Sequence, residues 1–89
     1  MNISAEISLY PLTENYESPI LSFIHRLKAR PGLLVATNGL STQLTGPYDK
    51  VMDALKEAMK PTLNDTVTCS FVIKILNVSI RPGENVAVE

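Results

Sequence analysis

The sequence predicts an α+β fold in which four antiparallel strands form one sheet and two helices cover one face of it. Two observations predict this fold class. In some segments apolar residues recur at every second position, as in strands, and in others they have the wider spacing of helices. The order of these segments is strand, helix, strand, strand, helix, strand. At 89 residues the chain also has the length of one small domain, whose core is modest.

The first predicted strand, residues 3–10, alternates strictly. Its apolar positions share one side: Ile3, Ala5, Ile7 and Leu9. Its polar positions share the other: Ser4, Glu6, Ser8 and Tyr10. This alternation is typical of a strand with one buried face. Pro11 lacks a backbone donor and is expected to end the strand.

A first helix is predicted to follow, with Ser18 as its N-cap and Pro19 at its first helical position. Its apolar stripe has the spacing i, i+3, i+4, i+7: Ile20, Phe23, Ile24 and Leu27. Pro31-Gly32 is expected to stop the helix.

Two strand-like segments, residues 33–37 and 40–45, flank the dipeptide Asn38-Gly39. This dipeptide favours the positive φ angles of a two-residue hairpin turn, so we expect a tight hairpin. In the second strand the expected inward residues are Leu40, Thr42 and Leu44. The expected outward residues are Ser41, Gln43 and Thr45.

Gly46-Pro47 precedes a second predicted helix, residues 48–59, which Pro61 is expected to end. Its apolar residues again follow helical spacing: Tyr48, Val51, Met52, Leu55 and Met59. A long β-branched strand is predicted at residues 66–76. Its expected core-facing residues are Val67, Cys69, Phe71, Ile73 and Ile75.

The complete order, βαββαβ, is that of the ferredoxin-like sandwich. We expect a ligand-binding domain at residues 1–78 and a tail at residues 79–89. In the tail, the turn signal Pro82-Gly83 precedes Val86-Ala87-Val88, which is a candidate for an extra edge strand.

The composition narrows the function classes. A net charge of −1 gives no basic surface for nucleic acid. A single cysteine, Cys69, cannot form an internal disulfide or the paired-cysteine site of a heavy-metal domain. Neither a membrane span of about 20 apolar residues nor a signal segment is recognisable, so we expect a cytoplasmic protein. His25, outside the apolar stripe, and core-facing Cys69 offer no catalytic pair, so we expect no enzyme activity.

The first and third strands are central in this fold, so their polar side chains lie in the middle of an uncovered sheet face. One interpretation is a solvated face, on which Glu6 and Lys74 form a weak cross-strand ion pair. The other is a polar recognition surface that binds a small ligand and is shielded when two sheets or subunits meet.

Three segments resemble the YkoF-like family of thiamin-binding proteins: SAEISLYPL (Ser4–Leu12) with the following Tyr16, LSTQLTG (Leu40–Gly46) and YDKVMDALKEAM (Tyr48–Met59). The resemblance covers residues 3–78. It implies the ferredoxin-like fold and binding of thiamin or its hydroxymethylpyrimidine part without chemical conversion, in uptake or salvage of the vitamin. It implies no cofactor. Members of the YkoF type carry two such repeats in tandem, so a single repeat implies a homodimer or homotetramer.

The positions matched by this resemblance are the expected ligand-binding residues: Glu6, Ser8, Tyr10, Ser41, Thr42 and Gln43. An aminopyrimidine needs both acceptors and donors, which carboxylate, hydroxyl and amide groups supply. Tyr10 or Tyr48 could pack on its ring. An unpaired Glu6 carboxylate would favour the positive thiazolium of thiamin, and Lys74 would oppose it. The alternation turns Thr42 toward the core, so its assignment rests on the resemblance alone.

The competing hypothesis is a structural or interaction protein whose polar sheet face mediates homo-oligomer assembly. The fold alone does not separate this hypothesis from ligand binding, because ferredoxin-like domains host many functions.

Overall fold

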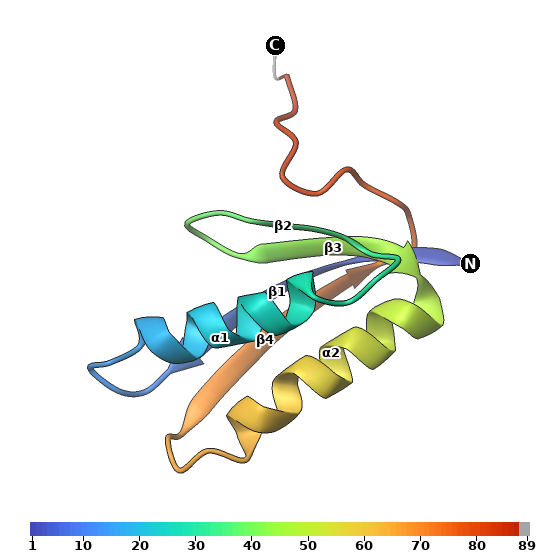
Figure 1. Ribbon diagram of the computed structural model, residues 1–89. Coiled ribbons are helices and arrows are strands. Elements are labelled where there is room, and N and C mark those ends of the chain that lie inside the picture. Colours follow the sequence, from blue (N-terminus) through green and yellow to red (C-terminus); the bar gives the residue numbers. More distant parts are fainter. Residues whose placement is uncertain (88–89) are drawn as a thin grey trace.

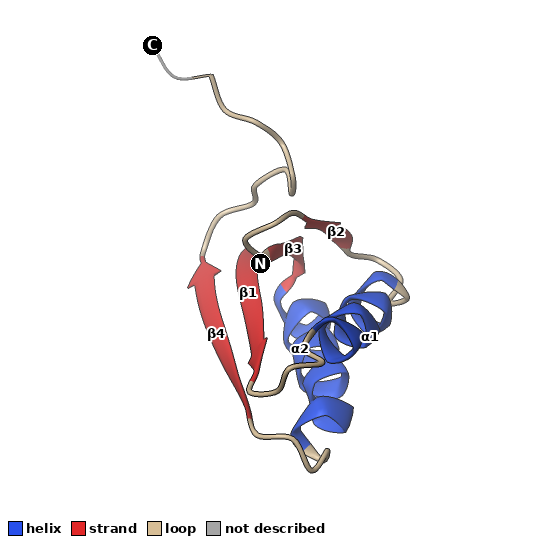
Figure 2. Cartoon of the chain, turned by 90° about the vertical axis from the view of Figure 1, so that its left-hand side faces the viewer, coloured by secondary structure: helices blue, strands red, loops and turns tan. Residues whose placement is uncertain are grey.

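Two layers, a sheet and a pair of helices, make up the structure, a computed structural model that describes residues 1–87. The elements are β1 (Asn2–Pro11), α1 (Glu17–Lys28), β2 (Leu34–Thr37), β3 (Thr42–Pro47), α2 (Tyr48–Leu63) and β4 (Cys69–Leu76). The four strands form one antiparallel sheet in the order β2-β3-β1-β4 (Figure 1). Both helices lie on the same side of it (Figure 2). The predicted ferredoxin-like fold is therefore confirmed.

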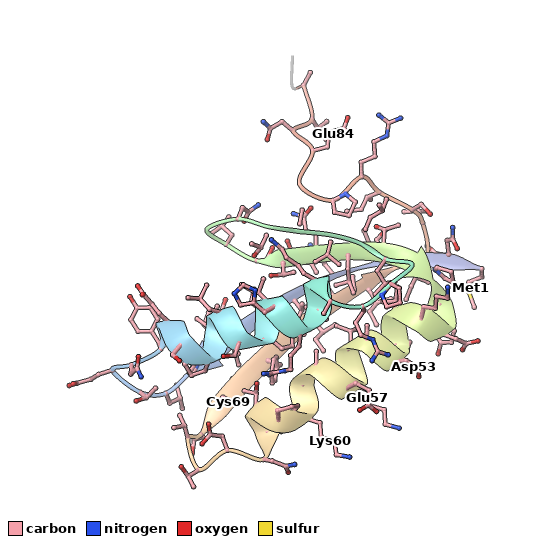
Figure 3. The ribbon with its side chains drawn as sticks, viewed as in Figure 1. Met1, Asp53, Glu57, Lys60, Cys69 and Glu84 are labelled. Carbon is pink, nitrogen blue, oxygen red and sulfur yellow. The ribbon has the colours of Figure 1, made fainter. Side chains whose placement is uncertain are left out.

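The core lies between the helices and the two central strands. All four apolar positions of β1 are buried, as the alternation predicts. They pack against Leu44 of β3, Phe23 and Leu27 of α1, and the buried side of α2, formed by Val51, Ala54, Leu55 and Ala58. Burying each large apolar side chain stabilises the fold by about 1.5–3 kcal/mol. The charged side chains of α2, among them Asp53, Glu57 and Lys60, lie on its outer side (Figure 3).

The predicted start of the first helix is wrong. Its N-cap is Tyr16, which makes no side-chain capping bond, and Ser18 and Pro19 are already inside α1. Proline is tolerated here because the first backbone N–H groups of a helix have no partner within the helix. The helix therefore needs no free donor at Pro19.

The predicted tight turn at Asn38-Gly39 is also wrong. β2 and β3 do form a hairpin, but Thr37 pairs with Thr42, so residues 38–41 make up the loop. No positive φ occurs at Asn38 or Gly39. Instead the Asn38 side-chain oxygen accepts hydrogen bonds from the backbone N–H groups of Leu40 (2.9 Å) and Ser41 (3.2 Å). The asparagine thus shapes the loop with its side chain rather than its backbone, and Leu40, expected to face inward, is exposed.

α2 runs past Pro61, which was predicted to end it, and stops at Leu63. Arg26 of α1 holds this last turn in place. Its guanidinium donates to the Ala58 carbonyl (3.0 Å) and to the Thr62 hydroxyl (2.6 Å). Proline removes one backbone hydrogen bond, but contacts between the helices support the turn around it.

β4 is three residues shorter than predicted, beginning at Cys69, and it forms an edge of the sheet. Phe71 faces the core, where its ring lies 5.1 Å from that of Phe23. Farther along, the expected core residues Ile73 and Ile75 remain 37% and 47% exposed, because the helices cover mainly the central strands. An open groove of about 460 Å³ separates α2 from β4. It is lined by Met52, Leu55, Lys56, Met59, Lys60, Leu63, Asn64, Ile73 and Ile75.

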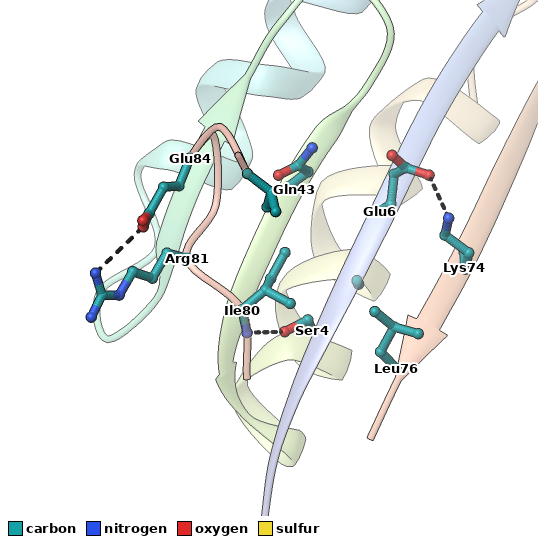
Figure 4. A pocket seen from close by; sticks show the side chains of 10 residues that line it. Ser4, Glu6, Gln43, Lys74, Leu76, Ile80, Arg81 and Glu84 are labelled. Carbon is teal, nitrogen blue, oxygen red and sulfur yellow. Dashed lines mark hydrogen bonds and ion pairs between the residues drawn. The ribbon is translucent and has the colours of Figure 1, made fainter. Parts of the chain in front are cut away.

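After β4 the tail, residues 77–87, turns back across the sheet face that the helices leave open (Figure 4). It contains the predicted turn at Pro82-Gly83, where Gly83 has a φ of 76°. The extra edge strand was predicted at residues 86–88; Val86 and Ala87 do not form a strand, and Val88 lies outside the described residues.

Candidate functional site

A row of polar side chains crosses the centre of the open sheet face. Glu6 of β1 is paired with Gln43 of β3 on one side and with Lys74 of β4 on the other. Partners in neighbouring strands have side chains on the same face and close together. The strand order therefore brings an amide, a carboxylate and an ammonium group into one line.

Glu6 is held at both oxygens of its carboxylate. The Ser41 hydroxyl donates to Oε2 at 2.9 Å, and Lys74 Nζ lies 3.3 Å from Oε1. The hydrogen bond from Ser41, followed by the hydrogen bond and positive charge of Lys74, lowers the pKa of Glu6 below its usual range. The negative charge of Glu6 is thus paired with the positive charge of Lys74, as the cross-strand interpretation predicted.

The tail is fastened to the sheet through Ser4. Its hydroxyl donates to the Val78 carbonyl (2.7 Å) and accepts from the Ile80 N–H (3.0 Å). It also lies 2.8 Å from the Thr45 hydroxyl of β3. Ser4 and Thr45 were expected to point outward on an uncovered sheet face, but they are only 1% and 6% exposed. Ser4 holds the tail, and Thr45 bonds to Ser4 rather than to the tail.

Next to the Ser4 hydrogen bonds, the tail and the side chains of Glu6, Gln43 and Lys74 line a pocket of about 470 Å³. This volume is within the size range of small-molecule sites. Among the described residues, ten line it: Ser4, Ala5, Glu6, Gln43, Lys74, Leu76, Ile80, Arg81, Glu84 and Val86. Figure 4 shows the tail along one side and Glu6 with Lys74 along the other. Two carboxylates and two cations give the lining a balanced charge.

Only two of the six predicted site residues, Glu6 and Gln43, line this pocket. The other four line a smaller hollow of about 290 Å³, between the loop of residues 38–41, the end of β1 and α1: Ser8, Tyr10, Ser41 and Thr42. Ser41 links the two places through its bond to Glu6.

The structure shows the contacts or exposure of three of these residues, Ser8, Thr42 and Tyr10. Ser8 donates to the Leu40 carbonyl (3.1 Å) and so supports the loop. Thr42 is 4% exposed and shares a hydrogen bond with Thr37. It points away from the open face, as its place in the alternation predicted. Tyr10 is 53% exposed and lines the smaller hollow together with Tyr16.

Sequence reasoning missed the contribution of the tail to the pocket. Ile80, Arg81, Glu84 and Val86 belong to a segment predicted only as a tail with a possible strand. Arg81 and Glu84 form an exposed ion pair at 3.6 Å. The sequence does contain the turn dipeptide Pro82-Gly83, but a turn motif does not indicate against which part of the fold the following residues pack.

Within residues 1–87, no cluster of three or more metal-ligating His, Cys, Asp or Glu side chains occurs. No helix in that part of the chain has the length and apolar character to cross a membrane.

The fold and the pocket define a ferredoxin-like domain with a candidate site on the sheet face opposite its helices. The chain belongs to the YkoF-related family, whose model matches residues 2–81. No curated protein matches it.

Solved structures share this fold. A hypothetical protein of Methanocaldococcus jannascii is 30% identical, with a TM-score of 0.76, over 88% of this chain and 81% of its own. A Streptococcus pneumoniae protein is 25% identical, with a TM-score of 0.74, over 90% of each chain. A Thermotoga maritima protein provisionally named for thiamine biosynthesis or salvage is 17% identical, with a TM-score of 0.65, over 82% of each chain, which shows likeness of fold alone.

Proposed function

We propose that this protein binds thiamin or its hydroxymethylpyrimidine part without converting it, and that it serves uptake or salvage of the vitamin in the cytoplasm. Membership of the YkoF-related family supports a thiamin-related role. The observation that carries the proposal is the pairing of Glu6 with Gln43 inside a pocket of about 470 Å³. A carboxylate beside an amide supplies the mixed acceptors and donors that an aminopyrimidine requires.

The apolar part of the pocket suits the flat ring of the ligand. Ala5, Leu76, Ile80 and Val86 contribute apolar surface between the charged groups. Small-molecule sites commonly combine such a lining with a few well-placed polar groups. The smaller hollow beside Tyr10 is less suited, because its hydroxyls are already engaged in supporting the loop.

Isothermal titration calorimetry with thiamin and hydroxymethylpyrimidine tests this proposal. We expect saturable binding and a raised melting temperature, because a ligand that binds only the folded state stabilises it. Glu6→Gln should weaken binding about tenfold, since it removes a charged acceptor. Glu57→Gln makes the same chemical change on the outer side of α2 and should leave affinity unchanged. Absence of heat and of a melting shift at millimolar ligand would refute the proposal.

A second candidate function, homo-oligomer assembly, is favoured by a different observation, the open edge of β4. The sequence-based hypothesis placed assembly of a dimer or tetramer at the polar sheet face, whereas the edge of β4 lies beside that face. β4 exposes unpaired backbone groups along its outer side and apolar side chains on both of its faces: Val72, Ile73, Ile75 and Leu76. Two antiparallel copies of one strand are self-complementary about a two-fold axis. We propose that a second copy covers this edge and the groove beside it.

A further inference from the structure

The orientation of the Gln43 amide is set by the tail. Its oxygen Oε1 accepts a hydrogen bond from the Gly83 N–H at 3.0 Å. A backbone N–H can bond only to an acceptor, so the amide oxygen must face the tail and the NH₂ group must face elsewhere. Figure 4 shows this nitrogen on the side of Glu6. While the tail is docked, Gln43 therefore turns its NH₂ donors toward Glu6 and its oxygen toward the tail.

Glu6 offers the opposite character immediately beside it. Each of its carboxylate oxygens has one partner, Ser41 or Lys74. A carboxylate oxygen can accept two hydrogen bonds, so both oxygens retain a free acceptor site. The two neighbouring side chains thus present a donor next to an acceptor, in a fixed order across β3 and β1.

We infer that the docked tail makes the pocket selective for a heterocycle whose edge carries a ring-nitrogen acceptor next to an amine donor. The acceptor meets the NH₂ group of Gln43, and the amine meets Glu6. The inference rests on the proposed function and deepens it, because it assigns which edge of an aminopyrimidine Gln43 and Glu6 recognise. A 4-hydroxypyrimidine in its keto form has a ring N–H beside a carbonyl, so both of its groups face the wrong partner.

Glycine is required where the tail meets the sheet. Gly83 has a φ of 76°, and a Cβ there would lie 2.8 Å from Cβ of Ala36 on β2. Gly83→Ala should therefore lift the tail, break the bond to Gln43 and let the amide rotate freely. Gly39→Ala is the matched control, because a Cβ at Gly39 meets nothing within 4 Å.

The experiment compares 4-amino-5-hydroxymethyl-2-methylpyrimidine with its 4-hydroxy counterpart by calorimetry. The wild type and Gly39→Ala should prefer the amino compound about tenfold or more, since the other compound leaves polar groups mismatched. Gly83→Ala should lose most of that preference. Gln43→Leu, which removes the amide while the tail keeps its glycine, should lose it as well, and circular dichroism melting confirms that each variant is folded.

The possible failures are separable. If the wild type binds both compounds equally, or if Gly83→Ala and Gln43→Leu keep the full preference, the inference is overturned while binding itself stands. If only Gln43→Leu loses the preference, Gln43 recognises the edge of the ligand but the tail does not orient the Gln43 amide. That result also overturns the inference. If the wild type binds neither compound, both the inference and the proposed function are overturned.

Discussion

Ser4 and Thr45 lie opposite each other on β1 and β3, and their hydroxyl oxygens are 2.8 Å apart. Because the Ser4 hydroxyl donates its proton to Val78, the proton between these two residues belongs to Thr45. Ser4 thereby takes part in three hydrogen bonds and joins the start of the chain to its tail.

Ser4→Ala is expected to free the tail and lower the free energy of unfolding by about 1–3 kcal/mol, because it leaves the buried Thr45 hydroxyl without a partner. Urea denaturation measures the loss. Ser8→Ala removes an exposed hydroxyl from the same strand and should cost less than half as much. Equal losses of unfolding free energy in the two variants would show that the buried Ser4 contacts stabilise the fold no more than the Ser8 hydrogen bond does.

Titration of Glu6 by NMR is expected to give a pKa below the ordinary glutamate value of about 4.3. The cause is the Ser41 hydrogen bond together with Lys74, both of which favour the charged form. Ser41→Ala should therefore raise the pKa of Glu6. A value unchanged by this substitution would contradict the hydrogen bond.

The same shift makes stability depend on pH. Because the pKa of Glu6 is lower in the folded state, these contacts stabilise the protein above the unfolded-state pKa, and the contribution is lost as pH falls through the folded-state pKa. The Glu6 side chain is 41% exposed, so the loss should be at most about 1 kcal/mol. Denaturation at pH 7 and pH 3 should show a smaller pH-dependent change in Glu6→Gln than in the wild type.

Gly46→Ala is expected to destabilise the fold by about 1–3 kcal/mol through overpacking. A Cβ at Gly46 would lie 2.6 Å from the Leu33 side chain and 3.2 Å from the Gly32 carbonyl oxygen. Chemical denaturation of this variant beside Gly39→Ala provides the measurement. A loss no greater than that of Gly39→Ala would mean that Leu33 moves aside at no cost.

Ile75→Lys is expected to dissociate the proposed oligomer, because it places a charge in the middle of the apolar β4 edge. Light scattering coupled to size-exclusion chromatography should give a multimer for the wild type and a monomer for the variant. Leu21→Lys, on α1 and 54% exposed, is the control and should leave the mass unchanged. A monomeric wild type at high concentration would contradict the assembly.

The sequence predicted the fold because the periodicity of β1 and of both helices reflects what they bury. It predicted Glu6 beside Lys74 and the inward orientation of Thr42 for the same reason. It failed where side chains decide local geometry, as Asn38 does in the hairpin loop. It also failed for the tail, because contacts between Ser4 and residues 78–80 join positions more than 70 apart, and no local pattern encodes them.

The strand order β2-β3-β1-β4 also has a consequence for synthesis on the ribosome. β1 precedes the other three strands in the sequence, and one of its two partners, β4, follows them all, so one edge of this central strand stays unpaired until all four strands have been made. Pairing distant segments is slow. Between emergence of β3 and arrival of β4, the nascent chain presents that edge of β1 to any chaperone or neighbouring chain that meets it.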